Sequence, residues 1–239
     1  DSMSWNQVGQ DVSDLSIGIE KVEDVHFISK YVLGKLKGAG DNHSFIQQKK
    51  LVKAYAAGNT SKSKTASELL AGNIGDLSIP AFGSIDQKTM DDFADYIQKR
   101  IQDLDSGHEV KGRIVDLRRN GGGNMHPMLA GLGPLTGAGI LGYFVYEAAG
   151  TKKYFLWSYQ AKKNNRKHTL GVRIANPYRL RNIDAPVAVL IGPKTASSGE
   201  MTAMSFIGRP GVRVFGQLSA GFTTSNDSYP LLDGSMLLL

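Results

Sequence analysis

The chain has 239 residues, of which 41% are hydrophobic and 21% charged, so it is long enough to bury a core and does not have the composition of a disordered protein. It contains no cysteine, which excludes disulfides, thiolate metal ligands and a cysteine nucleophile. The net charge of +6 favours anionic neighbours such as a cell-envelope surface. No stacking motif accompanies the scattered basic residues, so we expect no nucleic-acid partner.

The N-terminal third is predicted to be mostly helical. Apolar residues recur at three-to-four spacing over residues 22–36, and Gly38 and Gly40 then stop the helix. The polar stretch 58–67 indicates a boundary or an exposed connection. A second amphipathic helix begins at the capping pattern of residues 84–87 and is expected to pack on a sheet. Its apolar face carries Met90, Phe93, Ile97, Ile101 and Leu104.

Strands are predicted where β-branched and apolar residues cluster, and they alternate with helices. The segments are 75–79, 113–117, 140–146, 152–158 and 187–192. The basic stretch 162–168 is expected to be a solvated loop. The sequence therefore predicts an α/β fold with a mixed β-sheet. We divide it into a helical N-terminal cap region, residues 1–70, and an α/β core, residues 71–239.

A serine lies where a buried strand gives way to a helix. The segment PVAVLIGPKTASSGEMTAMSF, residues 186–206, is predicted to form a strand, a turn and a helix. At the helix start, Ser197 can act as a nucleophile while the N–H of Ser198 holds an oxyanion, because the first N–H groups of a helix are unpaired. A serine at this position is also an ordinary helix N-cap, and that is the commoner case when nothing else supports catalysis.

Three glycines follow another predicted strand, in GRIVDLRRNGGGN. Glycines let a backbone approach a ligand closely, so Gly122 or Gly123 can supply a second oxyanion donor, and Asn120 is expected to fix the loop. A plain tight turn is the alternative reading. A phosphate loop is disfavoured because no Lys-Ser/Thr pair follows and the GxGxxG spacing is not met.

A histidine in a loop is the expected general base. His43 comes just after the first predicted helix, and a loop can project its ring into a cleft. His126, which follows the glycines, is the reserve candidate. For any one histidine, a solvated or structurally satisfied side chain is the ordinary alternative.

Four segments, in order and spacing, resemble the tail-specific (C-terminal processing) serine protease family over about residues 24–239. They are Asp41–Ser44, Asp116–Gly123, Thr195–Glu200 and Val214–Gly221. The processing peptidases of that family pair their serine with a lysine about 25 residues downstream. Here Phe222 takes that place, so the sequence is similar to the branch with a histidine base, to which tricorn protease belongs. The resemblance implies that Ser197 is the nucleophile and His43 the base.

The sequence departs from the family in three respects. No segment is suited to a peptide-binding PDZ domain. Asn42 stands where tricorn protease has a serine before its histidine. The family continues through further strands beyond residue 239, so an orienting acid is expected there, unless Asp41 serves or the pair works as a dyad. Glu200, one turn after the serine, is expected to be structural.

The resemblance implies a serine peptidase that cleaves peptides near their C-terminus through an acyl-enzyme, without metal or cofactor. In this branch some members are bacterial envelope peptidases that cut lanthionine antimicrobial peptides. It also implies an extracytoplasmic location, with any signal or anchor outside this chain. The alternative is an inactive module of the same fold that binds a peptide or a hydrophobic ligand. Phe222 and Asn42, which depart from the catalytic residues of the family, keep this alternative open.

Overall fold

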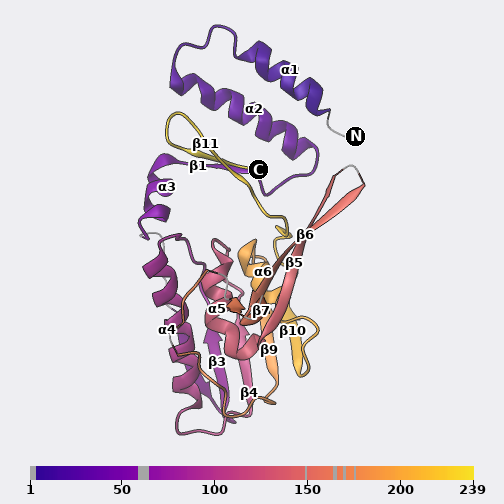
Figure 1. Ribbon diagram of the computed structural model, residues 1–239. Helices are drawn as coiled ribbons and strands as arrows, with labels where there is room; N and C mark the ends of the chain where they lie inside the picture. Colours follow the sequence, from indigo (N-terminus) through magenta and orange to yellow (C-terminus); the bar gives the residue numbers. More distant parts are fainter. Residues whose placement is uncertain (1–3, 59–64, 149, 164–165, 169–170, 175) are drawn as a thin grey trace. The chain divides into compact units, whose positions relative to one another are not determined.

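The computed structural model of the chain describes all residues except 1–3, 59–64, 149, 164–165, 169–170 and 175 (Figure 1). The chain forms two compact units: residues 1–54 with 224–239, and residues 55–223. The predicted division differs from this one, because residues 55–70 join the larger unit and the C-terminal residues join the smaller one. Whether residues 1–70 and 71–239 are separate domains stays a prediction.

The smaller unit combines helices with a three-stranded antiparallel sheet. Its elements are α1 (Trp5–Leu15), a short 3-10 helix (Val22–Asp24), α2 (Val25–Gly38), β1 (Phe45–Gln47), the start of α3 (Lys49–Ala56), β11 (Ser228–Pro230) and β12 (Met236–Leu238). The strand order is β1-β12-β11, with Phe45 opposite Leu238. The predicted helix over 22–36 is confirmed, although its first turn is a 3-10 helix.

A mixed five-stranded sheet forms the centre of the larger unit, as predicted. Its strands are β2 (Ala66–Leu70), β3 (Ile74–Ser78), β4 (Gly112–Asp116), β9 (Val187–Ile191) and β10 (Val212–Gly216), in the order β10-β9-β4-β3-β2. Only the β2–β3 pair is antiparallel. The three central strands match predicted segments. The carboxyl ends of β4 and β9 therefore lie side by side, and this edge is where parallel sheets commonly place their sites.

Three helices accompany this sheet: α4 (Gln87–Asp105), α5 (Met125–Thr136) and α6 (Ser198–Met204). Helix α4 packs on β2, β3 and α5, as its apolar face predicts. The expected capping start at Ser84 is wrong. Asp86 is the N-cap, because it is the last residue with extended backbone and its side chain accepts the N–H of Thr89, while Ser84 accepts the N–H of Asp86.

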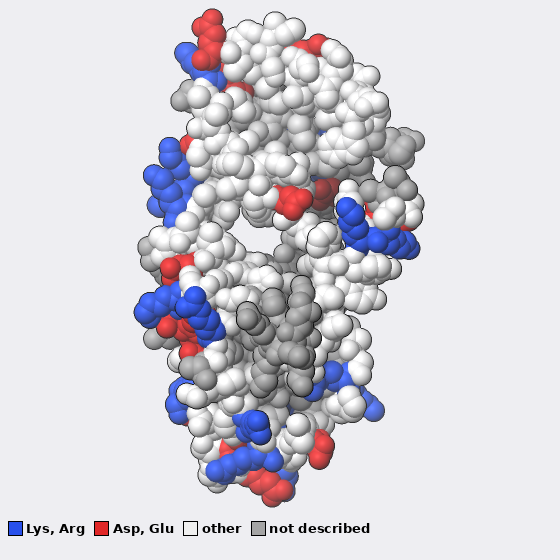
Figure 2. Space-filling model, in the orientation of Figure 1, with Lys and Arg blue, Asp and Glu red and all other residues white. Residues whose placement is uncertain are grey.

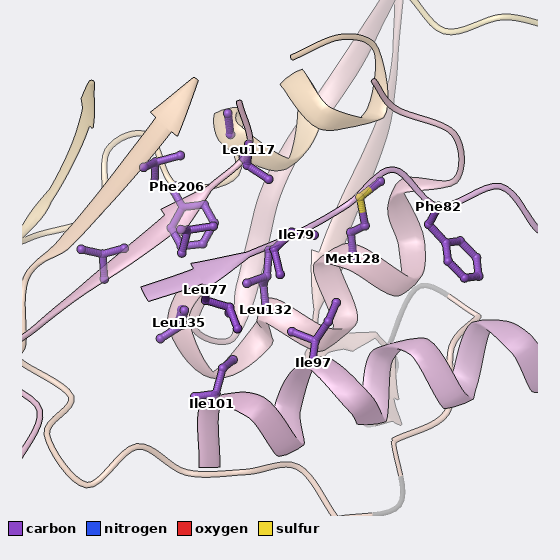
Figure 3. Close-up of a cluster of buried hydrophobic side chains, with 14 residues drawn as sticks. Leu77, Ile79, Phe82, Ile97, Ile101, Leu117, Met128, Leu132, Leu135 and Phe206 are labelled. Carbon is purple, nitrogen blue, oxygen red and sulfur yellow. The ribbon is translucent and has the colours of Figure 1, made fainter. Parts of the chain in front are cut away.

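Side chains of the sheet and the helices interlock in one buried cluster (Figure 3). Strand β3 and the residue after it supply Leu77 and Ile79, α4 supplies Ile97 and Ile101, and α5 supplies Met128, Leu132 and Leu135. Burial of each such side chain contributes on the order of 2 kcal/mol. This cluster fixes the strand ends from which the loops of the site emerge.

A long hairpin, β5 (Gly139–Ala148) with β6 (Thr151–Tyr159), confirms the strands predicted over residues 140–146 and 152–158. Its base is buried: Trp157 packs against Leu129 and Met201 and donates a hydrogen bond to Ser205. Farther out, it exposes Tyr143, Val145, Tyr146, Tyr154, Phe155 and Leu156. The basic stretch expected as a loop instead forms a small hairpin, β7 (Ala161–Lys163) with β8 (Arg166–His168), because its backbone pairs in register.

The polar segment 58–67 is only partly an exposed connection. Residues 59–64 lie outside the described part. Thr65 is buried and Ala66 begins strand β2, so the polar composition of this segment did not reveal that it runs into an edge strand. Between α3 and α4 the described residues form only the β2–β3 hairpin, and the stretch 57–86 is too short for a PDZ domain. None of the described helices has the length and apolar content that a membrane span requires. Described charges of both signs are mixed in small groups on the face seen in Figure 2.

Candidate active site

The predicted strand, turn and helix around Ser197 are confirmed. Strand β9 ends at Ile191, and α6 begins one residue after Ser197. Thr195 is fully buried and holds the turn: its hydroxyl accepts the N–H of Gly192 at 3.0 Å and donates to the carbonyl of Leu117 at 2.8 Å. The turn is therefore tied to the end of the neighbouring strand β4.

Ser197 has an unusual backbone conformation for a helix N-cap. Its φ is 51° and its ψ −123°, whereas the caps Ser4, Asp86 and Asn124 all have negative φ and extended ψ. A non-glycine residue in such a conformation costs about 1–3 kcal/mol. A sharp, strained strand-to-helix turn is also how many serine hydrolases present their nucleophile.

Asn120 organises the glycine loop, as expected. Its side chain is fully buried, accepts the N–H of Gly122 at 3.0 Å and donates to the carbonyl of Pro80 at 3.2 Å. Its main-chain oxygen accepts the N–H of Ala196 at 3.0 Å. One residue thus shapes the glycine loop and joins it to the turn that carries Ser197.

The glycine loop packs directly on the serine. A Cβ atom added to Gly122 would lie 2.9 Å from the Cβ of Ser197 and 3.1 Å from the nitrogen of Ser198. The N–H of Gly122 is already donated to Asn120, but those of Gly123 and Ser198 have no acceptor in the part of the chain that is described. These two N–H groups, rather than that of Gly122, are therefore the candidates for binding an oxyanion.

Glu200 links the serine to a third segment. Its carboxylate is 3% exposed and accepts the N–H of Ser197 at 2.8 Å, the N–H of Gly221 at 2.8 Å and the hydroxyl of Ser219 at 2.6 Å. Three charge-assisted hydrogen bonds satisfy a buried carboxylate. They agree with the structural role expected for Glu200.

His43 lies in the smaller unit, in the loop that follows α2. Asp41 builds this loop, because its carboxylate accepts the main-chain N–H groups of His43 at 2.7 Å and Ser44 at 3.1 Å, and the hydroxyl of Ser44 at 2.5 Å. Partial burial raises the pKa of Asp41, but the hydrogen bonds from Ser44 and His43 lower it more, so the net pKa lies below its ordinary value.

The imidazole of His43 meets a hydroxyl from the distant end of the chain. Its Nδ1 lies 2.9 Å from Oγ1 of Thr224, and the side chain of Asn226 donates to the His43 carbonyl at 2.9 Å. Asp41, the alternative candidate for the orienting acid, uses its hydrogen bonds within this loop, on the N–H groups of His43 and Ser44 and on the Ser44 hydroxyl. Sequence reasoning missed Thr224, since the only available signal was its place just beyond the Val214–Gly221 motif.

The reserve base, His126, lies in the first turn of α5, where Asn124 accepts its N–H at 3.0 Å. Burial lowers its pKa below the ordinary value, and its Nδ1 is buried without a partner in the described structure. His26 pairs instead with Asp233, with Nε2 and Oδ2 2.9 Å apart. No cluster of three metal-binding side chains occurs among the described residues.

A serine on a strained strand-to-helix turn, packed against a glycine loop at the carboxyl edge of a parallel sheet, is the arrangement of a serine hydrolase. Residues 73–239 match the family described as Peptidase family S41. The chain belongs to this peptidase family, which agrees with the tail-specific protease resemblance.

Two known proteins are similar to the chain along nearly its whole length. The chain is 32% identical over 238 residues to the nisin-resistance protein of Lactococcus lactis subsp. lactis, covering 99% of this chain and 69% of the relative. A solved lipoprotein structure from Streptococcus agalactiae superposes with a TM-score of 0.75 at 27% identity, over 100% of this chain and 77% of the other. The photosystem II D1 C-terminal processing protease shares the fold. Its structure superposes with a TM-score of 0.51 at 18% identity, over 76% of this chain and 43% of the other.

Proposed function

We propose that the protein is a serine peptidase in which Ser197 is the nucleophile and His43 the general base. The observation that carries the proposal is the strained backbone of Ser197 against Gly122. Strain of this kind persists only where the surroundings enforce it, and it gathers at functional sites. Membership of a peptidase family also supports a peptidase activity.

In the proposed reaction, Nε2 of His43 takes the proton of the Ser197 hydroxyl as Oγ attacks the peptide carbonyl. The N–H groups of Gly123 and Ser198 stabilise the oxyanion. His43 then gives its proton to the leaving amine as the C–N bond breaks. Water, activated by the same imidazole, hydrolyses the acyl-enzyme and restores both side chains. No metal or organic cofactor takes part in these steps.

The proposed substrates are peptides cut near their C-terminus, with lanthionine antimicrobial peptides of the nisin type as the specific class. Similarity to the nisin-resistance protein supports this class. We further propose an extracytoplasmic, cell-envelope location, which the lipoprotein relative and the net charge of +6 favour.

The test combines active-site labelling with product analysis. Purified wild type, Ser197→Ala and His43→Ala are treated with a fluorophosphonate, and in parallel with nisin and a peptide library followed by mass spectrometry. Ser106→Ala and His108→Ala, at the exposed end of α4, serve as matched controls. We expect labelling and cleavage in wild type and controls, and at least a 10³-fold loss in the two active-site variants. Unimpaired turnover in either variant removes that residue from the scheme. Ligand binding without labelling of the wild type indicates the inactive binding module.

A further inference from the structure

The segment Ser219–Thr224, here called the strap, is anchored next to the nucleophile at its first end. Ser219 and Gly221 both donate to Oε1 of Glu200, whose Oε2 accepts the N–H of Ser197. The N–H of Ala220 donates to the carbonyl of Thr195 at 2.9 Å, in the same turn. Three consecutive strap residues are thus fastened to the structure that presents Ser197.

The other end of the strap carries the hydroxyl that contacts the proposed base. Thr224 Oγ1 lies 2.9 Å from Nδ1 of His43, and two residues later Asn226 holds the main chain of the same histidine. Only two residues, Phe222 and Thr223, separate the anchored Gly221 from Thr224. Glu200 and Thr224 therefore act on opposite ends of one short stretch of backbone.

We infer that Thr224 is a positioning residue for His43, and that Glu200 holds the strap on which Thr224 is carried. This inference rests on the proposed function, and it gives Thr224 the role of orienting His43 that was expected of an acid. Asp41 is occupied with its own loop, whereas Thr224 contacts the ring itself. A neutral hydroxyl takes the position that a carboxylate holds in a Ser-His-Asp triad.

The chemistry of a hydroxyl suits this role. A neutral imidazole carries one N–H, and the tautomer is set by the hydrogen bond that this group makes. When Nδ1–H donates to Thr224 Oγ1, Nε2 keeps its lone pair and can accept the proton of the serine. Loss of the hydroxyl removes this restraint on the tautomer and the ring orientation, so a smaller fraction of the molecules is ready to react.

Thr224 is tested by three substitutions in the full chain. Thr224→Val removes the hydroxyl at nearly constant shape, Thr224→Ser keeps a hydroxyl, and Thr224→Asp supplies a carboxylate. The measurements are kcat and KM for nisin cleavage by mass spectrometry, and the rate of fluorophosphonate labelling. Thr224→Val is expected to lower kcat and labelling roughly 10- to 100-fold with KM within about twofold, whereas Thr224→Ser stays within about threefold of wild type.

The pH profile separates positioning of the imidazole from a merely structural effect. A carboxylate beside an imidazole favours its charged form, so Thr224→Asp is expected to move the acid limb of kcat/KM upward by about one pH unit. A structural role would leave this limb in place. Thr224→Val with wild-type kcat, or Thr224→Asp with an unmoved limb, overturns the role of Thr224.

The anchor is tested with Ser219→Ala, because Glu200 is itself buried and its variants also remove the acceptor of the Ser197 N–H and can fail to fold. Ser219→Ala keeps the bond from Ser197 to Glu200 and is expected to lower kcat about 3- to 10-fold. Ser225→Ala, outside the strap, is the control and should stay within about 1.5-fold. An unchanged kcat in Ser219→Ala removes Glu200 from the inference. Absence of wild-type labelling and cleavage contradicts the proposed function itself, whereas an active wild type with unaffected strap variants contradicts the strap alone.

Discussion

The side-chain oxygen of Asn120 accepts the N–H of Gly122 across 3.0 Å, while the main-chain oxygen of Asn120 accepts the N–H of Ala196 at the same distance. The glycine loop and the nucleophile turn therefore share one buried residue. Any change at Asn120 acts on both sides of the candidate oxyanion site, although its side chain does not reach the substrate in the proposed mechanism.

Replacement of this asparagine should destabilise the fold and lower activity together. Asn120→Ala leaves the N–H of Gly122 and the carbonyl of Pro80 without their partner, which costs about 2–3 kcal/mol of unfolding free energy. Urea unfolding measures this loss. The control is Asn42→Ala, which removes one exposed hydrogen bond to Gly40 and should change the unfolding free energy by less than about 0.5 kcal/mol. Equal effects of the two variants would contradict the role of Asn120.

The three loop glycines should respond very differently to alanine. At Gly122 a methyl group would meet the carbonyl oxygen of Ala196 at 2.8 Å, and at Gly123 it would meet that of Phe82 at 2.1 Å. Both glycines have positive φ, 101° and 107°. Gly121 has nothing within 4 Å of an added Cβ.

We therefore expect Gly122→Ala and Gly123→Ala to reduce the labelling rate at least 100-fold, since the backbone must move away from the serine. Gly121→Ala should keep a rate within about threefold of wild type, since its site is open. Fluorophosphonate labelling measured beside circular dichroism separates loss of the site from loss of the fold. A Gly122→Ala protein that is folded and fully reactive would speak against this loop as part of the site.

A buried ion pair should be costly to break. The guanidinium of Arg113 lies 2.8 Å from the carboxylate of Asp105, and their side chains are 4% and 1% exposed. Tyr178 and the N–H of Arg181 also donate to Asp105, both at 3.2 Å. Asp105→Ala leaves the buried guanidinium of Arg113 without its carboxylate partner and should lower the unfolding free energy by about 3–5 kcal/mol.

The exposed pair Lys99–Asp103 provides the comparison for Asp105→Ala. Lys99→Ala should cost no more than about 0.5 kcal/mol, because solvent screens an exposed i,i+4 pair. Thermal or urea unfolding of both variants gives the two values. A small cost for Asp105→Ala would mean that Arg113 finds another partner or reaches water.

The central fold could be predicted from the sequence because its strands and its long helix show a regular spacing of apolar residues. Strands β3, β4 and β9 and helix α4 have strong apolar patterns and all contribute to the core. Helix α1 repeats Trp5, Val8, Val12 and Leu15 at helical spacing, which agrees with the mostly helical N-terminal third that the sequence predicts. Strand β11 is exposed along its length and leaves no hydrophobic pattern, so its formation depends on the neighbouring strand rather than on local preference.

The same distinction holds for the candidate site. Ser197 and the glycines follow β9 and β4, which are adjacent parallel strands, so their proximity follows once the topology is known. Thr224 contacts a residue 181 positions away, and no local pattern predicts that hydroxyl. Asp41 looks like the partner of His43 from spacing alone, but an aspartate two residues before an N–H readily caps its own turn.

Acid should weaken the fold partly through His126. Burial lowers the pKa of His126 in the folded state, so the unfolded chain binds a proton more readily. This group therefore contributes stability that is fully present above the unfolded pKa of about 6.5, and that is lost as the pH falls through the lower folded value. His126→Gln removes the titration and should flatten this part of the stability profile.

The measurement for His126 is urea unfolding at several pH values between about 4.5 and 8, for wild type and His126→Gln. The difference between their unfolding free energies should change as the pH falls below about 6.5, in the direction that disfavours the wild type. His108→Gln, at an exposed turn, controls for loss of a histidine that is open to solvent in the folded protein. Parallel profiles for wild type and His126→Gln would contradict this prediction, because they would mean that the imidazole reaches water when it is protonated.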